Sequence, residues 1–180
     1  MTSLFRRLTE AVYDPQQEHL PQIGVEFQHR LLKSNTVKLQ IWDFAYYGER
    51  TYHSFVPYFR NAKIVMIVGR TSTDHALENL RADFHKLQDN MVANSYYQVL
   101  LVSNVENEKP RTYSTQEGHQ LAEKLGAFYI ELNLKQDVGS QVALKLEEMI
   151  DKINLDYEMG QTNKPRIPTP EEEENKCTLI

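Results

Sequence analysis

Three short apolar runs, separated by helical patterns, constrain the fold of this chain more than any other feature. The runs are KIVMIV at 63–68, QVLLV at 98–102 and FYI at 128–130. Continuous apolar runs of this length are typical of strands that are covered on both faces of a sheet. Such strands in alternation with helices predict an α/β fold whose sheet is largely parallel.

Helical periodicity follows each of the three runs. Thr73 is a candidate cap for the first helix, and Ser140 precedes the third. The second begins with Ser114 and Glu117, which have the spacing of a capping box, and Gly126 predicts its C-terminal end. The apolar stripes are Leu77, Leu80, Phe84 and Leu87; Leu121 and Leu125; and Val142, Leu146, Met149, Ile150 and Ile153. Each stripe predicts a helix with one face on the core.

Two segments of alternating pattern precede the apolar runs. They are VEFQHRLLK at 25–33 and TVKLQIW at 36–42, and Ser34 and Asn35 lie between them. The apolar residues that share a face are Val25, Phe27 and Leu31 in the first segment, and Val37, Leu39 and Ile41 in the second. The pattern predicts two half-buried strands in an antiparallel hairpin at the edge of the sheet.

Length and composition predict a single domain. A chain of 180 residues that is 41% hydrophobic can bury one sizeable core. We expect this domain to span residues 1–155. Residues 156–180 contain three prolines and a run of four glutamates, so they predict a disordered, solvated tail.

Charge and cysteine content exclude several classes of function. The net charge is −5 and no run of Lys and Arg stands out, so a nucleic-acid partner is not expected. Cys177 is the single cysteine, which excludes an intramolecular disulfide and fits a reducing compartment. The N-terminus lacks the apolar region of a signal peptide, and no window approaches the ~20 apolar residues of a membrane span. We therefore expect a cytoplasmic protein, and a monomer.

Three motifs in order resemble the Rab branch of the small GTPases. They are IGVEF at 23–27, KLQIWD at 38–43 and HSFVPYFRNA at 53–62, and the similarity runs from Thr2 to Ile153. The segments TSTDHALENL and EGHQLAEKLGAFYIE agree with the same family, as does a cysteine four residues from the end. The resemblance implies the P-loop small-GTPase fold, GTP or GDP bound with Mg²⁺, and a role in vesicle-mediated membrane traffic.

The residues at the positions that bind phosphate and Mg²⁺ depart from the family pattern. The resemblance places the sequence MTSL where G-K-[ST]-S-L ends the phosphate loop, so we expect the glycine loop and the first central strand to be missing. Thr2 then matches the hydroxyl that binds Mg²⁺, and Gln22 stands at the switch threonine. Asp43 matches the carboxylate that holds Mg²⁺ through water, although it could equally be an ordinary strand-end aspartate. An incomplete chain of a longer, competent GTPase remains an alternative.

The residues after Asp43 lack the groups that support hydrolysis. The family pattern D-x-x-G-Q is replaced by the sequence DFAYYG, so the glycine that meets the terminal phosphate is displaced. No glutamine remains to orient the attacking water. The resemblance therefore implies a degenerate GTPase, with slow hydrolysis as the alternative.

The base-reading motifs are also altered. The family's N-K-x-D appears as NVEN, from Asn104 to Asn107, and its S-A-K appears as Asn133, Leu134 and Lys135. Guanine presents two donors to the aspartate, whereas Asn107 offers one acceptor and one donor. We therefore expect weaker guanine selectivity, and a carbonyl-bearing base such as xanthine would suit Asn107 better. The S-A-K element acts through a backbone N–H, which substitution leaves in place.

Partner-binding positions are retained. In Rab proteins an exposed aromatic triad binds effectors, and the matching residues here are Phe27, Trp42 and Tyr58, with Ile23 beside them. An exposed aromatic patch on a polar surface is a good anchor for a partner. The alternative is that these side chains only cover the hairpin.

Cys177 lies in the C-terminal sequence CTLI, which fits a prenylation motif. Its apolar last residue favours a geranylgeranyl chain. The upstream EEEENK is acidic, so one lipid chain would hold the protein reversibly on the cytosolic face of intracellular membranes. The leading hypothesis is a prenylated module that binds Rab effectors and the prenylation machinery, with weak or no nucleotide turnover.

Overall fold

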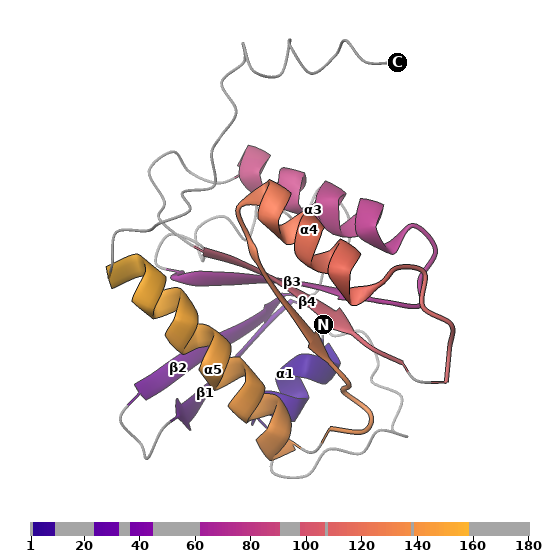
Figure 1. The fold of residues 1–180 in the computed structure, drawn as a ribbon. Coiled ribbons are helices and arrows are strands. Elements are labelled where there is room, and N and C mark those ends of the chain that lie inside the picture. The colour runs from indigo at the N-terminus through magenta and orange to yellow at the C-terminus, as the bar shows by residue number, and fades with distance from the viewer. Residues whose placement is uncertain are drawn as a thin grey trace.

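The computed structural model describes residues 2–9, 24–32, 37–44, 62–90, 98–106, 108–137 and 139–158. These residues form an α/β fold with two sheets, which confirms the predicted fold class (Figure 1). The strands are β1 (Val25–Leu32), β2 (Val37–Phe44), β3 (Ile64–Arg70), β4 (Gln98–Asn104) and β5 (Phe128–Leu132). The helices are α1 (Thr2–Thr9), α3 (Ala76–Asn90), α4 (Thr115–Leu125) and α5 (Gly139–Glu158).

Strands β3, β4 and β5 form a parallel sheet with β4 at its centre. The sheet is covered on both faces, as the apolar runs predict. Val99 and Leu101 of β4 pack toward α3 and α4, whereas Leu100 and Val102 pack toward α1 and α5. All four side chains are at most 2% exposed, so β4 forms the centre of the core.

Helix α4 shows how local signals and packing agree. The Ser114 hydroxyl accepts a hydrogen bond from the Glu117 amide, the Glu117 carboxylate accepts one from the Ser114 amide, and Gly126 has the left-handed φ of 64°. The capping box and the C-terminal glycine are thus both confirmed. A side chain at Gly118 would lie 2.2 Å from the ring of Tyr129, so α4 rests directly on β5 at this point.

Two expected helix starts are shifted. Helix α3 begins at Ala76, after His75 in the left-handed region at φ 56°, so Thr73 lies outside it. The backbone carbonyl of Thr73 accepts a hydrogen bond from the Thr112 hydroxyl. Helix α5 begins at Gly139, which puts Ser140 inside the helix rather than at its cap.

Strands β1 and β2 form a separate antiparallel sheet in which Phe27 lies opposite Trp42. Residues that face one another share a side of the sheet, so Val25, Phe27 and Leu31 lie on the same side as Trp42. Ile41 lies on the other side, which packs on the core. We call these sides the outer and inner faces of the hairpin. Val25 and Leu31 are exposed, so the interpretation of the first segment as half-buried is wrong for these two residues.

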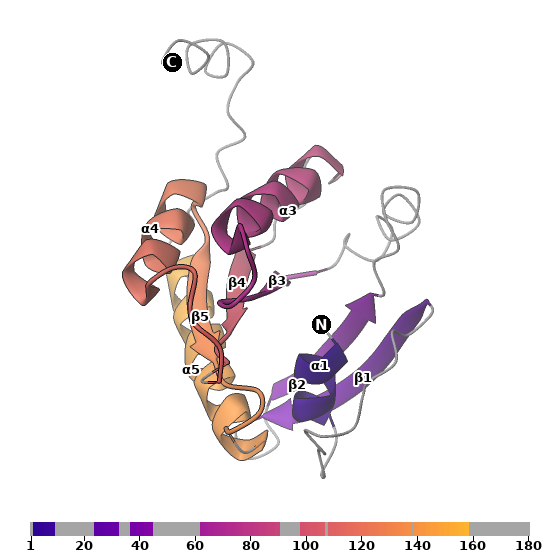
Figure 2. The same ribbon diagram turned by 90° about the vertical axis from the view of Figure 1, so that its right-hand side faces the viewer.

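Helix α1 covers the inner face, and no sequence pattern singled it out. Leu4, Phe5 and Leu8 are each at most 4% exposed, and the helix contacts β1, β2 and α5. Figure 2 shows α1 against the hairpin, with the parallel sheet to the left of both. No described strand joins β2 to β3, where the resemblance places the family's first strand. None of the described helices has the length and apolar character that a membrane span requires.

Candidate functional site

The loop that follows β5 meets the end of β4 through the side chain of Asn104. Its Oδ1 atom accepts a hydrogen bond from the Leu134 amide at 3.1 Å. Asn133 Oδ1 accepts from the amides of Lys135, at 3.2 Å, and Gln136, at 2.9 Å. The structure thus brings together four of the residues expected to bind a nucleotide base.

Further side chains hold this loop from outside. Asp137 Oδ2 accepts from the Asn133 amide at 3.2 Å and from Lys145 Nζ at 2.6 Å. Lys135 Nζ lies 3.0 Å from Glu108 Oε2. We call residues 133–137 the base loop, because it carries the expected base-contacting positions. It is ordered by the protein's own side chains.

Arg7 of α1 also binds the base loop. Its Nε–H donates to the Leu134 carbonyl at 2.8 Å, and its Nη2 donates to the Lys135 carbonyl at 3.1 Å. The pattern analysis did not single out this residue. The available signal was an arginine on the same stripe as Leu4 and Leu8, where an apolar residue would be expected.

A cavity of about 320 Å³ opens beside the base loop. It reaches from Gly69 and Arg70 at the end of β3, along α3, to Asn104 and Leu134. In open α/β sheets, ligands bind outside the carboxyl ends of the strands, and this cavity lies at such an edge. Its volume is at the lower end of the range for small-molecule sites.

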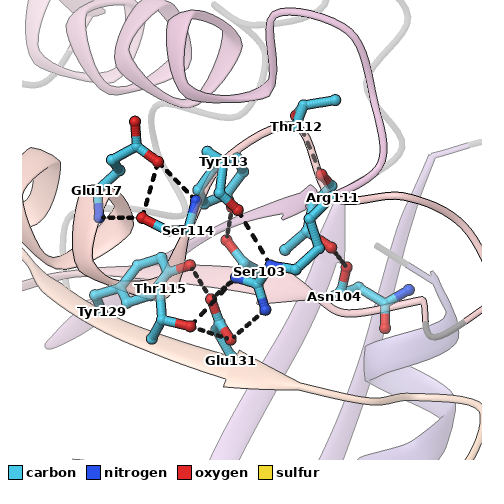
Figure 3. A network of polar contacts seen from close by, with 11 residues as sticks. Ser103, Asn104, Arg111, Thr112, Tyr113, Ser114, Thr115, Glu117, Tyr129 and Glu131 are labelled. Atoms are coloured by element: carbon cyan, nitrogen blue, oxygen red, sulfur yellow. Dashed lines mark hydrogen bonds and ion pairs between the residues drawn. The ribbon is translucent and has the colours of Figure 1, made fainter.

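A polar network lies behind the base loop, on the side of α4 (Figure 3). Arg111 binds the carboxylate of Glu131 through two nitrogens, at 2.5 and 3.1 Å, and Tyr129 donates to the same carboxylate at 2.8 Å. The hydroxyls of Ser103 and Tyr113 are 2.5 Å apart and buried. The network links β4, β5 and the loop before α4.

Burial and hydrogen bonding act in opposite directions on Glu131. Burial raises the pKa of its carboxyl group, but hydrogen bonds from Arg111 and Tyr129 favour the ionised form and leave the pKa below its usual value. Burial also raises the pKa of the Tyr129 phenol, which remains protonated. The network therefore joins a carboxylate, a guanidinium and neutral hydroxyls, and its role is structural.

The outer face of the hairpin carries an exposed aromatic pair. The ring centroids of Phe27 and Trp42 are 4.4 Å apart at an interplanar angle of 41°, and His29 lies 5.1 Å from Phe27. Trp42 remains 41% exposed, and Leu31 on the same face is 53% exposed. Two of the residues expected to bind effectors therefore lie together on the surface.

Asp43 lies on the inner face and is only 7% exposed. Its cross-strand neighbour is Glu26, whose Oε2 atom is buried without a hydrogen-bond partner among the described residues. Thr2 begins α1, and the position of its side chain is not among those described. Within the described part of the chain, no three acidic, histidine or cysteine side chains gather in a way that could hold a metal.

Five expected site residues lie wholly outside the described ranges. They are Gln22, Ile23, Tyr58, Asn107 and Cys177. Their assignments to the switch, the effector site, the base and the lipid stay predictions.

Comparison with known proteins assigns the class. Residues 1–154 match the model of the Ras family. The chain is 31% identical to Ras-related protein Rab-18 of Lymnaea stagnalis, over 99% of this chain and 89% of that protein. It is 28% identical to Ras-related protein Rab-18 of Caenorhabditis briggsae, over 98% of this chain and 87% of that protein. It is 28% identical to Ras-related protein SEC4 of Saccharomyces cerevisiae, over 84% of this chain and 72% of that protein.

The fold, the base loop and these matches define a small GTPase. The chain belongs to the Ras family and, within it, is Rab-like. Family membership implies a role in vesicle traffic and binding of GTP or GDP with Mg²⁺.

The described residues fit that nucleotide only in part. For Mg²⁺ they supply one matching carboxylate, Asp43, which is buried on the inner face. For the base, the Leu134 amide already donates to Asn104, so a base carbonyl would have to share this donor. No step of hydrolysis follows from these groups.

Proposed function

We propose that this protein is a degenerate Rab that acts as a partner-binding module, with weak or absent nucleotide turnover. The outer face of the hairpin recruits Rab effectors, and the protein does not need a cycle of hydrolysis to present it. Phe27 and Trp42 form the centre of this face, and by the family resemblance Tyr58 and Ile23 also contact the partner.

The observation that carries this proposal is the exposed aromatic pair. Trp42 packs against Phe27 in a tilted arrangement with ring centroids 4.4 Å apart, yet 41% of its surface remains in contact with solvent. Val25 and Leu31 extend the same face and are also exposed. Aromatic side chains with apolar neighbours are the usual anchors of protein interfaces, because a partner can bury a large area on a few rigid groups.

The catalytic and base-binding groups support the second half of the proposal. The sequence after Asp43 offers no glutamine to orient water, and Asn107 replaces the second acceptor that guanine requires. The Leu134 amide is engaged by Asn104 in the protein itself. An unmatched donor of a bound guanine would cost roughly 1–3 kcal/mol, which weakens its binding.

Membrane association would use a lipid on Cys177. The thiolate would attack geranylgeranyl diphosphate, form a thioether and release diphosphate, as its position in the sequence CTLI suggests. Incubation with the Rab prenylation machinery and labelled geranylgeranyl diphosphate tests this step. One label per chain is expected, and none in Cys177→Ser. Equal labelling of Cys177→Ser would reject Cys177 as the acceptor.

Proximity labelling in cells tests the partner surface. The chain is compared with a Phe27→Ala, Trp42→Ala double variant and with Leu144→Ala, which truncates an exposed leucine on α5. We expect Rab effectors to be enriched by the chain and by Leu144→Ala, and to be lost with the double variant. Effector enrichment that survives in the double variant would contradict the assignment of this face.

Nucleotide extraction from the purified, folded chain tests turnover and binding. We expect well below one purine nucleotide per chain, and no rise in melting temperature with Mg²⁺ and GTP or xanthosine triphosphate. Nucleotide at one per chain would overturn the claim of weak binding. Hydrolysis that disappears in Asp43→Ala would establish the alternative, a slow but active GTPase.

A further inference from the structure

Arg7 is a buried cation on the apolar face of α1. Its side chain is 7% exposed, and Leu4 and Leu8 on the same face belong to the hydrophobic core. A guanidinium is costly to bury unless its donors are paired. The carbonyls of Leu134 and Lys135 pair with it at 2.8 and 3.1 Å.

Arg7 binds carbonyl groups of the base loop, whereas Asn104 and Asn133 bind its amide groups. Asn104 and Asn133 accept hydrogen bonds from the loop's amides, so they fix its N–H groups. Arg7 donates to two consecutive carbonyls of the same loop. It comes from a helix that is 127 residues away in the sequence, whereas the asparagines lie within 30 residues of the amides that they bind.

The helix that carries Arg7 is itself held in place. Arg30 of β1 donates through Nη1 to the carbonyl of Leu8, in the last turn of α1, at 2.5 Å. A cation at this position also complements the negative end of the helix dipole. Arg7 therefore reaches the base loop from a helix that is fixed against the inner face of the hairpin.

We infer that Arg7 is a positioning residue for the base loop. It sets the orientation of the Leu134 amide by holding the carbonyls of Leu134 and Lys135, which follow this amide along the backbone. Arg7 acts through the loop backbone. This inference rests on the loop's own contacts, so it holds whether or not the protein binds a nucleotide.

Amide hydrogen exchange of the full, nucleotide-free chain tests this role, through the amides of residues 134–136. In Arg7→Met, exchange at these amides should rise by about ten- to a hundredfold, because two charge-assisted hydrogen bonds are lost. Protection of residues 99–102 in β4 should remain. Arg7→Lys should give an intermediate rise, since its ammonium keeps the charge but lacks the planar fork that holds both carbonyls in a fixed geometry.

Arg111→Met is the matched control. It also removes an arginine that donates hydrogen bonds, but those bonds go to Glu131, Tyr113 and Thr115 on the side of α4. It should lower the melting temperature and leave exchange at residues 134–136 unchanged. If Arg111→Met raises exchange there as much as Arg7→Met does at equal melting temperature, the effect is global and the inference fails. Unchanged exchange in both Arg7 variants would also overturn it.

A second readout applies if a nucleotide binds. Arg7→Met should then lower the ratio of the affinities for GTP and for the triphosphate of 2-aminopurine riboside, because the second base lacks the carbonyl that the Leu134 amide would bind. Equal loss of both affinities would indicate a merely structural role for Arg7. If neither nucleotide binds to the unmodified chain, the exchange measurement decides the inference alone.

Discussion

The parallel sheet and the hairpin bury their apolar residues very differently. In β4, four consecutive apolar residues from Val99 to Val102 are at most 2% exposed. On the outer face of the hairpin, Val25, Leu31 and Trp42 are each at least 36% exposed. Both regions are rich in apolar side chains, so composition does not separate them. The first region stabilises the fold, whereas the second leaves its apolar surface available to a partner.

This difference teaches that a strand's role follows from what covers it. Helices α3 and α4 cover one face of the parallel sheet, and α1 and α5 cover the other. Among the described elements, α1 packs on the inner face of the hairpin, whereas Val25, Leu31 and Trp42 on the outer face are exposed to solvent or to a partner. Substitutions in the two regions should therefore separate stability from recognition.

The largest effect is expected from Phe84→Ala. Phe84 is 1% exposed in the cluster between α3 and the parallel sheet, so its truncation should lower the free energy of unfolding by about 3–5 kcal/mol. Leu31→Ala on the hairpin, with a 53% exposed side chain, should change it by about 0.5 kcal/mol or less. Urea denaturation of both variants checks the contrast, and similar losses would remove it.

A smaller effect is expected at the cap of α4. Ser114→Ala removes the hydroxyl that accepts from the helix amide, which should cost about 0.5–2 kcal/mol. Thermal unfolding measures the loss, and Ser114→Asp should recover most of it because aspartate also caps helices. A full loss in Ser114→Asp would show that the hydroxyl acts in another way.

The loss of folding stability from Trp42→Ala should be smaller still. An aromatic pair contributes about 0.5–1.5 kcal/mol beyond the area that it buries, and Trp42 forms such a pair with Phe27. Effector binding, measured by titration calorimetry, should nevertheless be lost. A variant that unfolds would place the hairpin among the stabilising elements and would remove the distinction between the two regions.

The smallest effect is expected from Glu131→Gln, and it depends on pH. Burial raises the pKa of Glu131, but the hydrogen bonds from Arg111 and Tyr129 lower it by more, so the folded-state pKa is below the unfolded one. Ionised Glu131 therefore stabilises the fold above its unfolded-state pKa, and this contribution is lost as the pH falls through the folded-state pKa. Unfolding measured at neutral and acidic pH should show the variant's deficit shrinking in acid. A deficit that grows in acid would contradict the sign.

Local patterns predicted the parallel sheet and α4 well. The apolar runs of β3, β4 and β5 are continuous because both sides of these strands are buried, and that cause leaves a direct trace in the sequence. Ser114, Glu117 and Gly126 act within one helix, so their spacing was sufficient. The family motifs singled out Asn104 and Leu134, and the structure joins them by a hydrogen bond.

Long-range contacts account for what the sequence did not reveal. Arg7 binds carbonyls 127 residues away, and no local pattern reports such a contact. Helix α1 has eight residues and is formed around side chains that pack on other elements. Which face of β1 is exposed depends on where α1 lies, so alternation predicted a two-sided strand but not its orientation.

The shortness of α1 has a consequence for the order of folding. A helix of eight residues is well below the ~12–15 residues that an isolated helix needs in water, because nucleation is costly. Thr2–Thr9 should therefore become helical only when the core that receives Leu4, Phe5 and Leu8 has formed. We expect α1 to form late and to fray early, so that its helicity reports whether the two sheets have come together.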